Sequence, residues 1–128
     1  MSIPTAKSLI LKAQDNLEVA NKTLSDNTQH EVTGYNLAQA CELLLKALLE
    51  MRGTEYPHDE EGHDLDNLIV ILEEEGFSDI SSHADIIDLT PYNDTRSHIN
   101  PDDRIILKDY LGYVEDLKKL VGEQLKLY

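Results

Sequence analysis

The sequence predicts an all-α protein arranged as a helical bundle. Apolar residues recur at steps of three and four along most of the 128 residues, which is the period of an amphipathic helix. No window alternates polar and apolar residues as a half-buried strand does. One stretch, residues 35–52, is apolar over an arc of about 200°, wider than a surface helix needs. We therefore expect this helix to be covered on several sides and to form the centre of the bundle.

The apolar arc of the central helix consists of Leu37, Ala38, Ala40, Cys41, Leu44, Leu45, Ala47, Leu48 and Leu49. The remaining sector carries Gln39, Glu42, Lys46 and Glu50. This polar ridge indicates a helix that is central without being wholly enclosed. Gly53 follows directly and is expected to end the helix in the left-handed conformation.

A long amphipathic helix is expected before it, from about residue 4 to residue 25. Its apolar face consists of Ala6, Leu9, Ile10, Ala13, Leu17, Ala20 and Leu24. Pro4 suits the first turn, where a backbone N–H is not needed. Residues 25–29 form a short polar connection, so the first two helices should be antiparallel neighbours.

Helical segments also follow the polar loop 53–63. The first is about three turns long, with Asp64 as its cap and Gly76 at its end. The next should start with a serine cap at residues 81–82, and it should kink or restart at Pro91.

The last helix has a well-formed start signal. Asn100 can cap it, Pro101 occupies the first position, and Asp102 and Asp103 lie in the first turn. Its apolar face continues close to Leu125.

The composition limits the function. The chain has 25 acidic and 11 basic residues and a net charge of −14. Binding to nucleic acid depends on cations that neutralise phosphates, and no cationic cluster is present, so we expect no binding to duplex DNA. A basic protein partner is compatible with this charge.

The length favours a single domain over residues 1–128. The only cysteine, Cys41, lies on the buried arc and cannot form an internal disulfide. We predict a small core residue in a reduced, cytoplasmic setting rather than a reactive thiol. Neither a secretory signal nor a membrane span is expected.

The central helix resembles a family signature. Residues 39–47, Gln-Ala-Cys-Glu-Leu-Leu-Leu-Lys-Ala, are similar to the Gln-Ala-x-Glu-x-x-x-Lys-Ala pattern on the second helix of HEPN domains, nucleotide-binding domains of prokaryotes and higher eukaryotes. The resemblance is to the prokaryotic, nucleotidyltransferase-associated type and spans about residues 6–120. Its further matches are Gly53, Pro57, His63, Asp64, Leu65, Leu68, Tyr92 and Arg96.

The resemblance implies a four- to five-helix up-and-down bundle, commonly a homodimer, with no cofactor. Members are often encoded with a small nucleotidyltransferase and bound to it, frequently as a toxin–antitoxin pair. A catalytic branch cleaves RNA without a metal, using an arginine and a histidine separated by four to six residues at the dimer seam. A guanidinium can clamp the phosphate while an imidazole moves the 2′-hydroxyl proton.

The chain departs from the catalytic pattern. Counting from Arg96, residues 101–103 stand where the histidine is expected, and they are a proline and two aspartates. His98 is separated from Arg96 by only one residue. Arg52 and His58 have the spacing but flank a different loop, so we treat that match as accidental. We expect a binding module rather than an enzyme, and the alternative is an RNA-cleaving toxin with an altered Arg96 and His98 motif.

The polar stretch after Pro91 is the predicted ligand site. Arg96 would bind a phosphate, Tyr92 would stack or hydrogen-bond, and Asn93 and His98 would add polar contacts. The structural alternative is that Arg96 pairs with a carboxylate and holds the kink.

Two other groups of polar residues have structural explanations. His58 and His63 lie in an acidic loop, but no third nitrogen or sulfur ligand is fixed nearby, so we predict no metal site. His63 and Asp64 would instead cap the following helix. Glu42 and Lys46 would form a helix-stabilising pair worth about 0.3–0.5 kcal/mol, with a pocket wall or dimer contact as the alternative.

Overall fold

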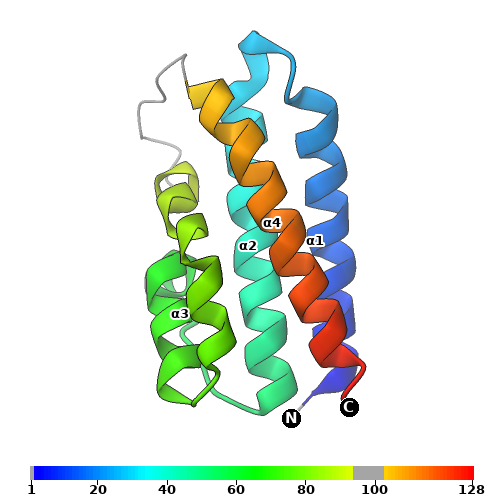
Figure 1. Cartoon of the computed structure of the whole chain (residues 1–128), viewed down its shortest axis with the longest axis vertical. Coiled ribbons are helices and arrows are strands. Elements are labelled where there is room, and N and C mark those ends of the chain that lie inside the picture. The colour runs from blue at the N-terminus through cyan, green and yellow to red at the C-terminus, as the bar shows by residue number, and fades with distance from the viewer. Residues whose placement is uncertain (1, 94–102) are drawn as a thin grey trace.

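The computed structural model describes residues 2–93 and 103–128. Within these ranges the chain forms four α-helices and three 3₁₀ segments and contains no strand, which confirms the all-α prediction. Helix α2 (His30–Arg52) lies in the centre, with α1 (Ile3–Thr23) beside it and α4 (Asp103–Leu125) in front of it, as Figure 1 shows. None of the described helices is long and apolar enough to cross a membrane.

Helices α1 and α2 are antiparallel neighbours, as predicted. The connection contains only a short 3₁₀ segment, η1 (Asn27–Gln29), so α2 begins at His30, earlier than residue 35. The Oγ1 atoms of Thr23 and Thr33 lie 2.5 Å apart at one end of the helix pair. At the other end, the backbone N–H of Ser2 donates to the carbonyl of Glu50 at 3.1 Å. The two helices therefore pack along their whole lengths.

The predicted central helix is confirmed, because every residue of its apolar arc is buried. Gly53 ends α2 with φ of 69°, as expected. The expectation of an open polar ridge is wrong at Glu42, which is only 4% exposed. The loop after α2 folds back over this part of the helix, and Lys46 and His63 supply the opposite charge and hydrogen bond that a buried carboxylate requires.

Helix α3 (Leu65–Glu74) begins and ends as predicted. The Asp64 carboxylate accepts hydrogen bonds from the backbone N–H groups of Asp66 and Asn67, and Gly76 adopts φ of 87° after the helix. Arg52 donates to the carbonyl of Glu75 at 3.0 Å. A cation is favourable at a helix C-terminus, so Arg52 ties the end of α2 to the end of α3.

The segment predicted as a further helix is a long 3₁₀ segment, η3 (Ser78–Asn93). Neither serine caps it: Ser81 bonds to Glu73, and Ser82 donates to the Asp79 carbonyl. The predicted interruption at Pro91 is also absent, since the 3₁₀ conformation continues to Asn93. The buried side chains of this stretch are Phe77, Ile80, Ile86 and Leu89, and Ile87 and Tyr92 pack partly buried against the core. The four buried positions are separated by multiples of three, and this spacing fits the three residues per turn of a 3₁₀ helix.

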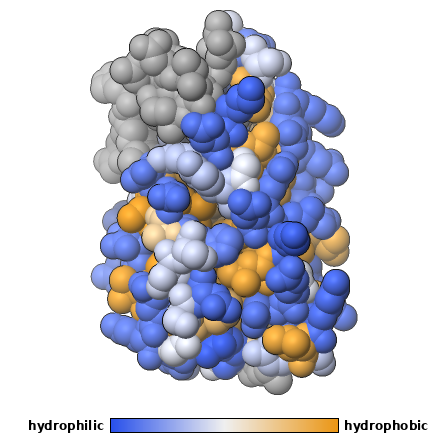
Figure 2. Space-filling model, viewed as in Figure 1, coloured by the Kyte–Doolittle hydropathy of each residue, from blue (hydrophilic) through white to orange (hydrophobic). Residues whose placement is uncertain are grey.

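Helix α4 packs its apolar face against α2. Leu107, Val114, Leu117 and Val121 are fully buried. Tyr110 donates from its hydroxyl to Asp88 at 2.6 Å and so links α4 to η3. The predicted start signal at residues 100–102 lies outside the described residues. Figure 2 shows that the surface on this side of the molecule is mostly hydrophilic, with separate apolar patches.

Candidate functional site

Tyr92 lies at the end of η3 and packs against the first half of α2. Its ring lies directly over Gly34, so closely that a Cβ at position 34 would overlap the ring carbons. The ring packs against the core but is not fully covered. Of the predicted ligand residues, Tyr92 is therefore held firmly by the fold.

The other predicted ligand residues are Asn93, Arg96 and His98. Arg96 and His98 lie outside the described residues, and so does the side chain of Asn93. The structure thus fixes the two ends of the segment that carries Arg96 and His98: η3 ends at Asn93, and α4 begins at Asp103.

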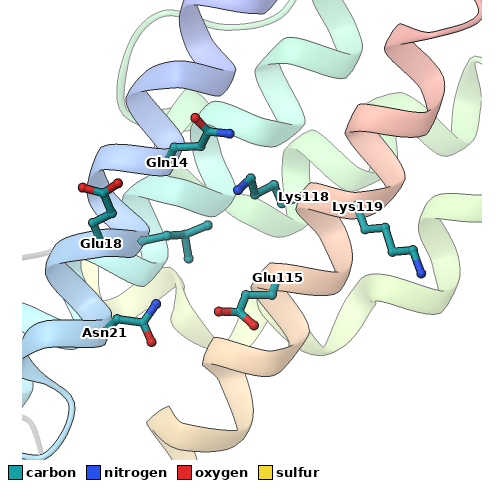
Figure 3. A pocket seen from close by; sticks show the side chains of 7 residues that line it. Gln14, Glu18, Asn21, Glu115, Lys118 and Lys119 are labelled. Atoms are coloured by element: carbon teal, nitrogen blue, oxygen red, sulfur yellow. The ribbon is translucent and has the colours of Figure 1, made fainter.

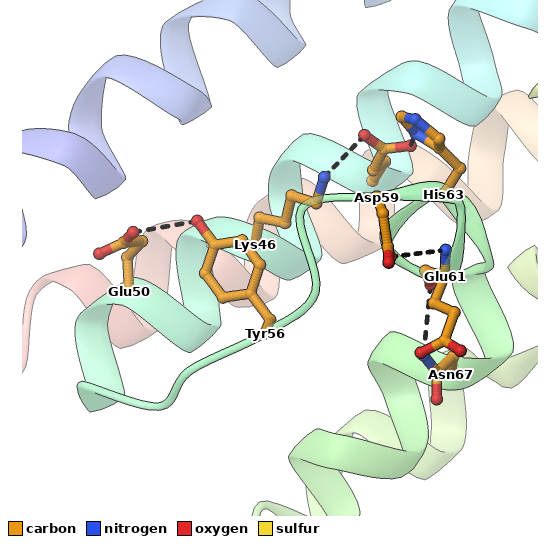
Figure 4. A network of polar contacts seen from close by, with 8 residues as sticks. Lys46, Glu50, Tyr56, Asp59, Glu61, His63 and Asn67 are labelled. Carbon is orange, nitrogen blue, oxygen red and sulfur yellow. Dashed lines mark hydrogen bonds and ion pairs between the residues drawn. The ribbon is translucent and has the colours of Figure 1, made fainter.

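A polar network covers the middle of α2, as Figure 4 shows. Glu42 accepts a hydrogen bond from Lys46 at 2.9 Å, and its second oxygen lies 2.8 Å from Nδ1 of His63. The side chains of Glu42 and Lys46 are 6% and 13% exposed, whereas that of His63 is 54% exposed. A carboxylate this deeply buried is stable only when it is paired. Lys46 and His63 are therefore held by Glu42.

The same loop makes a second contact with α2 through Tyr56. The Tyr56 hydroxyl donates to Glu50 at 2.9 Å, and the Lys46 ammonium lies 5.9 Å from the centre of the ring. Burial, together with the Glu50 hydrogen bond, raises the pKa of Tyr56 to about 12. His63 and Tyr56 thus fasten the loop 53–63 to α2 at two points.

Comparison with known protein families identified a match to most of the chain. A family model described as HEPN domain covers residues 6–124. The chain belongs to the HEPN domain family. No curated protein and no solved structure matches it.

The HEPN signature on α2 has a structural explanation in this chain. Its glutamate and lysine, Glu42 and Lys46, are the pair that anchors His63 and the loop. A third signature residue, Gln39, lies half-buried on the same side of α2. The signature therefore fastens the loop to the central helix, and it presents no free cation at Lys46.

The acidic loop of this HEPN domain does not bring its two histidines together. His63 bonds to Glu42, whereas His58 packs against the Tyr56 ring with centroids 4.9 Å apart. The prediction that His63 helps to cap α3 is wrong, since the Asp64 carboxylate and the Thr90 hydroxyl accept the hydrogen bonds of the first backbone N–H groups. In the described part of the chain, no group of three or more His, Cys, Asp or Glu residues is placed to hold a metal ion.

The HEPN bundle also has a cleft between α1 and α4 that sequence reasoning missed. The cleft is open to solvent, has a volume of about 610 Å³ and is lined by acidic, basic and amide side chains (Figure 3). Its lining residues are Gln14, Leu17, Glu18, Asn21, Glu115, Lys118 and Lys119. It forms because both helices pack on α2 and leave a gap between them. No local pattern in the sequence says that these helices are neighbours.

Gly34 is the site residue that sequence reasoning should have found. A glycine within a helix of strong helix formers costs about 1 kcal/mol relative to alanine, so it indicates a close approach by another group. Nothing in the residues around Gly34 indicates which group approaches it. Tyr92 is 58 positions away along the chain, and only the fold brings it onto Gly34.

Proposed function

We propose that this HEPN protein is a binding module that recognises a nucleotide-like ligand through Tyr92 and the polar residues that follow it. In this proposal Arg96 binds a phosphate, Tyr92 contacts the base or sugar, and Asn93 and His98 add hydrogen bonds. The module would be a homodimer and would act with a small nucleotidyltransferase in a toxin–antitoxin-type system.

The observation that supports this proposal is the packing of the Tyr92 ring against Gly34. A fixed, partly uncovered aromatic ring can stack on a base, and such stacking is worth about 1–3 kcal/mol per base. Arg96 follows Tyr92 by four positions. An arginine can bind a phosphate with two parallel hydrogen bonds.

Two other basic side chains already have partners within the fold, which supports the choice of Arg96 as the phosphate-binding residue. Lys46 is paired with the buried Glu42, and Arg52 is bonded to the end of α3. With a net charge of −14, the general surface repels a phosphate. An anionic ligand therefore needs a local basic group, and Arg96 follows Tyr92 by only four positions in the sequence.

Ligand binding can be tested by titrating the purified chain with ATP, AMP and inorganic phosphate while its melting temperature is recorded. We expect a saturable increase with a nucleotide that Arg96→Ala abolishes and Tyr92→Leu reduces. Lys7→Ala, which removes an exposed lysine on α1, is the control and should bind like the parent. No increase with any of the three ligands would overturn the proposal in favour of a purely structural module.

An RNA cleavage assay in the presence of a chelator separates binding from catalysis. We expect no cleavage by the parent protein. Cleavage that is lost in both Arg96→Ala and His98→Ala would identify the chain as a metal-independent ribonuclease.

The partner can be tested independently. If a neighbouring reading frame encodes a small nucleotidyltransferase, co-expression should give a complex that co-purifies with this chain. Failure of the two proteins to associate would remove the partner from the proposal and leave ligand binding untouched.

A further inference from the structure

The cleft between α1 and α4, which we call the α1/α4 cleft, carries charged groups of both signs. Two carboxylates and two ammonium groups line it: Glu18, Glu115, Lys118 and Lys119. Two other clefts of the molecule, one beside Tyr56 and one beside Asp64, are lined by carboxylates and by no lysine or arginine. In a chain with a net charge of −14, the α1/α4 cleft can therefore accept an anionic group as well as a cationic one.

The two signs of charge lie at different levels of the cleft. Helices α1 and α4 run in opposite directions (Figure 1). The side chains of Gln14 and Lys118 point toward one another across the cleft, and so do those of Asn21 and Glu115, as Figure 3 shows. The side chain of Lys119 points away from α1. The cleft thus has a cationic end and an anionic end, each with an amide opposite the charge.

The four side chains that point into the cleft have no partner among the described residues. None of them makes a hydrogen bond or an ion pair with another described residue. Lys118 and Lys119 follow Glu115 at the three- and four-residue steps of a helical ion pair, yet in the described chain neither pairs with it. Glu42 and Lys46, at the same four-residue step on α2, do pair. The polar groups of the cleft are therefore available to a ligand.

We infer that the α1/α4 cleft binds a short peptide in its zwitterionic form, with a free ammonium group at one end and a free carboxylate at the other. Lys118 and the Gln14 amide donate hydrogen bonds to the carboxylate, and Glu115 and the Asn21 amide oxygen accept hydrogen bonds from the ammonium group. Tyr92 does not line this cleft, so the inference is independent of the proposed function.

The spacing of the lining residues limits the length of the peptide. Glu115 and Lys118 are three positions apart, which is about 4.5 Å along α4, and Gln14 and Asn21 are seven positions apart, which is about 10 Å along α1. An extended peptide spans about 3.3–3.6 Å per residue. A dipeptide or a tripeptide therefore reaches both ends of the cleft. A single α-amino acid carries both charges on one carbon atom and is too short.

The size and the floor of the cleft fit such a ligand. Its volume of about 610 Å³ lies within the range of about 300–1,000 Å³ that is typical of small-molecule sites. Leu17 lies between Gln14 and Asn21 on α1 and is only 5% exposed, so it supplies apolar surface for a small side chain of the peptide. Because the cleft is open to solvent, we expect a dissociation constant on the order of 1 mM.

The test is a titration of the parent chain with trialanine, followed by the backbone amide signals in NMR spectra. We expect saturable shifts at Leu17, Glu115 and Lys118. Trialanine that is acetylated at its N-terminus and amidated at its C-terminus has neither charge, and glycine is too short. Neither should cause saturable shifts at the same concentrations.

Variants of the lining residues test the two ends of the cleft. Lys118→Gln and Glu115→Gln should each raise the dissociation constant for trialanine by about two- to fivefold, the range for an ion pair open to solvent. Lys119→Gln and Asp116→Asn are the matched controls and should bind like the parent. Lys119 points away from α1, and Asp116 does not line the cleft. Circular dichroism melts check that all four variants are folded.

The outcomes separate the cleft from the rest of the surface. The absence of saturable shifts with trialanine would overturn the inference, and so would equal binding of the blocked peptide, because the end charges would then not be recognised. Shifts centred on Tyr92 would place the peptide at a different site and overturn the assignment to this cleft. Equal losses in Lys118→Gln and Lys119→Gln would show that only net charge matters, which also contradicts the inference. None of these results depends on nucleotide binding near Tyr92.

Discussion

At the scale of single residues, the contact between Gly34 and Tyr92 joins the central helix to the predicted ligand site. Gly34 is buried in α2, where its missing side chain leaves room for the aromatic ring. The ring in turn fixes the end of η3, and the segment with Arg96 and His98 continues from there. Gly34 thus positions Tyr92, which is proposed to bind the ligand.

Gly34→Ala should destabilise the protein by about 1–3 kcal/mol, because its Cβ overlaps the Tyr92 ring and the core must shift. Gly112→Ala on α4 is the control. Its Cβ would meet no other atom, so the better helix propensity of alanine should stabilise the protein by up to about 1 kcal/mol. Urea denaturation followed by circular dichroism measures both.

The two substitutions should therefore change the free energy of unfolding in opposite directions. In a Tyr92→Ala background the cost of Gly34→Ala should disappear, because the ring that caused the overlap is gone. Equal stabilities of the Gly34→Ala and Gly112→Ala proteins would contradict the packing of Tyr92 on Gly34.

At the scale of elements, the loop 53–63 and η3 both depend on packing against α2. The loop contains few apolar residues and is held by two polar contacts, that of His63 with Glu42 and that of Tyr56 with Glu50. The η3 segment is held by the buried side chains of Ile80, Ile86 and Leu89, which are separated by multiples of three positions. Neither element has the helical repeat of about 3.6 residues that sequence reasoning relied on.

The Tyr56 contact makes stability sensitive to alkaline pH. In the unfolded chain Tyr56 has the ordinary tyrosine pKa of 10.0, whereas burial and Glu50 raise the pKa to about 12 in the folded state. Above pH 10 the unfolded state therefore binds fewer protons than the folded state. We expect the free energy of unfolding to fall as pH rises from about 10 to about 12. At lower pH the proton on Tyr56 is bound in both states, so Tyr56 causes no pH dependence of stability there.

Replacing the tyrosine tests this expectation. Tyr56→Phe should reduce the alkaline loss of stability, measured by urea denaturation at several pH values. Tyr35→Phe changes a tyrosine that is 41% exposed and should leave the alkaline loss in place. An alkaline slope that is identical in the parent and Tyr56→Phe would show that the loop contact does not contribute. The pKa of Tyr110 is also raised by burial, so Tyr110 contributes to the alkaline loss of stability in the parent and in both variants alike.

At the scale of the whole molecule, α2 is the element on which every other helix depends. Helices α1, α3 and α4 and the η3 segment all pack against it. Cys41 lies at its centre with no exposed surface, and burial raises the pKa of its thiol. As predicted, it is a core residue.

Cys41 should therefore report on the opening of the whole bundle. A thiol reagent such as DTNB should not label the native protein, because the reagent needs an exposed thiolate. Labelling should begin at the denaturant concentrations that unfold the helices. Ser8→Cys, which places a thiol at an exposed position of α1, should react at once in the native state. Rapid labelling of native Cys41 would instead mean that α2 opens locally without global unfolding.

The sequence by itself determined the parts of the protein that depend on neighbouring residues. The apolar arc of α2, the Asp64 cap, and the turns at Gly53 and Gly76 were predicted correctly, since a helix and its ends are set by residues within a few positions. The HEPN resemblance rested on such local spacings too, and the family match over residues 6–124 confirms it.

Only the tertiary structure decided the contacts between distant segments. Glu42 and His63 are 21 positions apart, and their pairing turned an expected solvent-exposed carboxylate into a buried one. The contact of Tyr92 with Gly34 and the cleft between α1 and α4 likewise bring together distant parts of the chain, and no local sequence pattern indicates that these parts are neighbours. Periodicity shows which side of a helix is covered, but the packing of the whole chain decides which residues cover it.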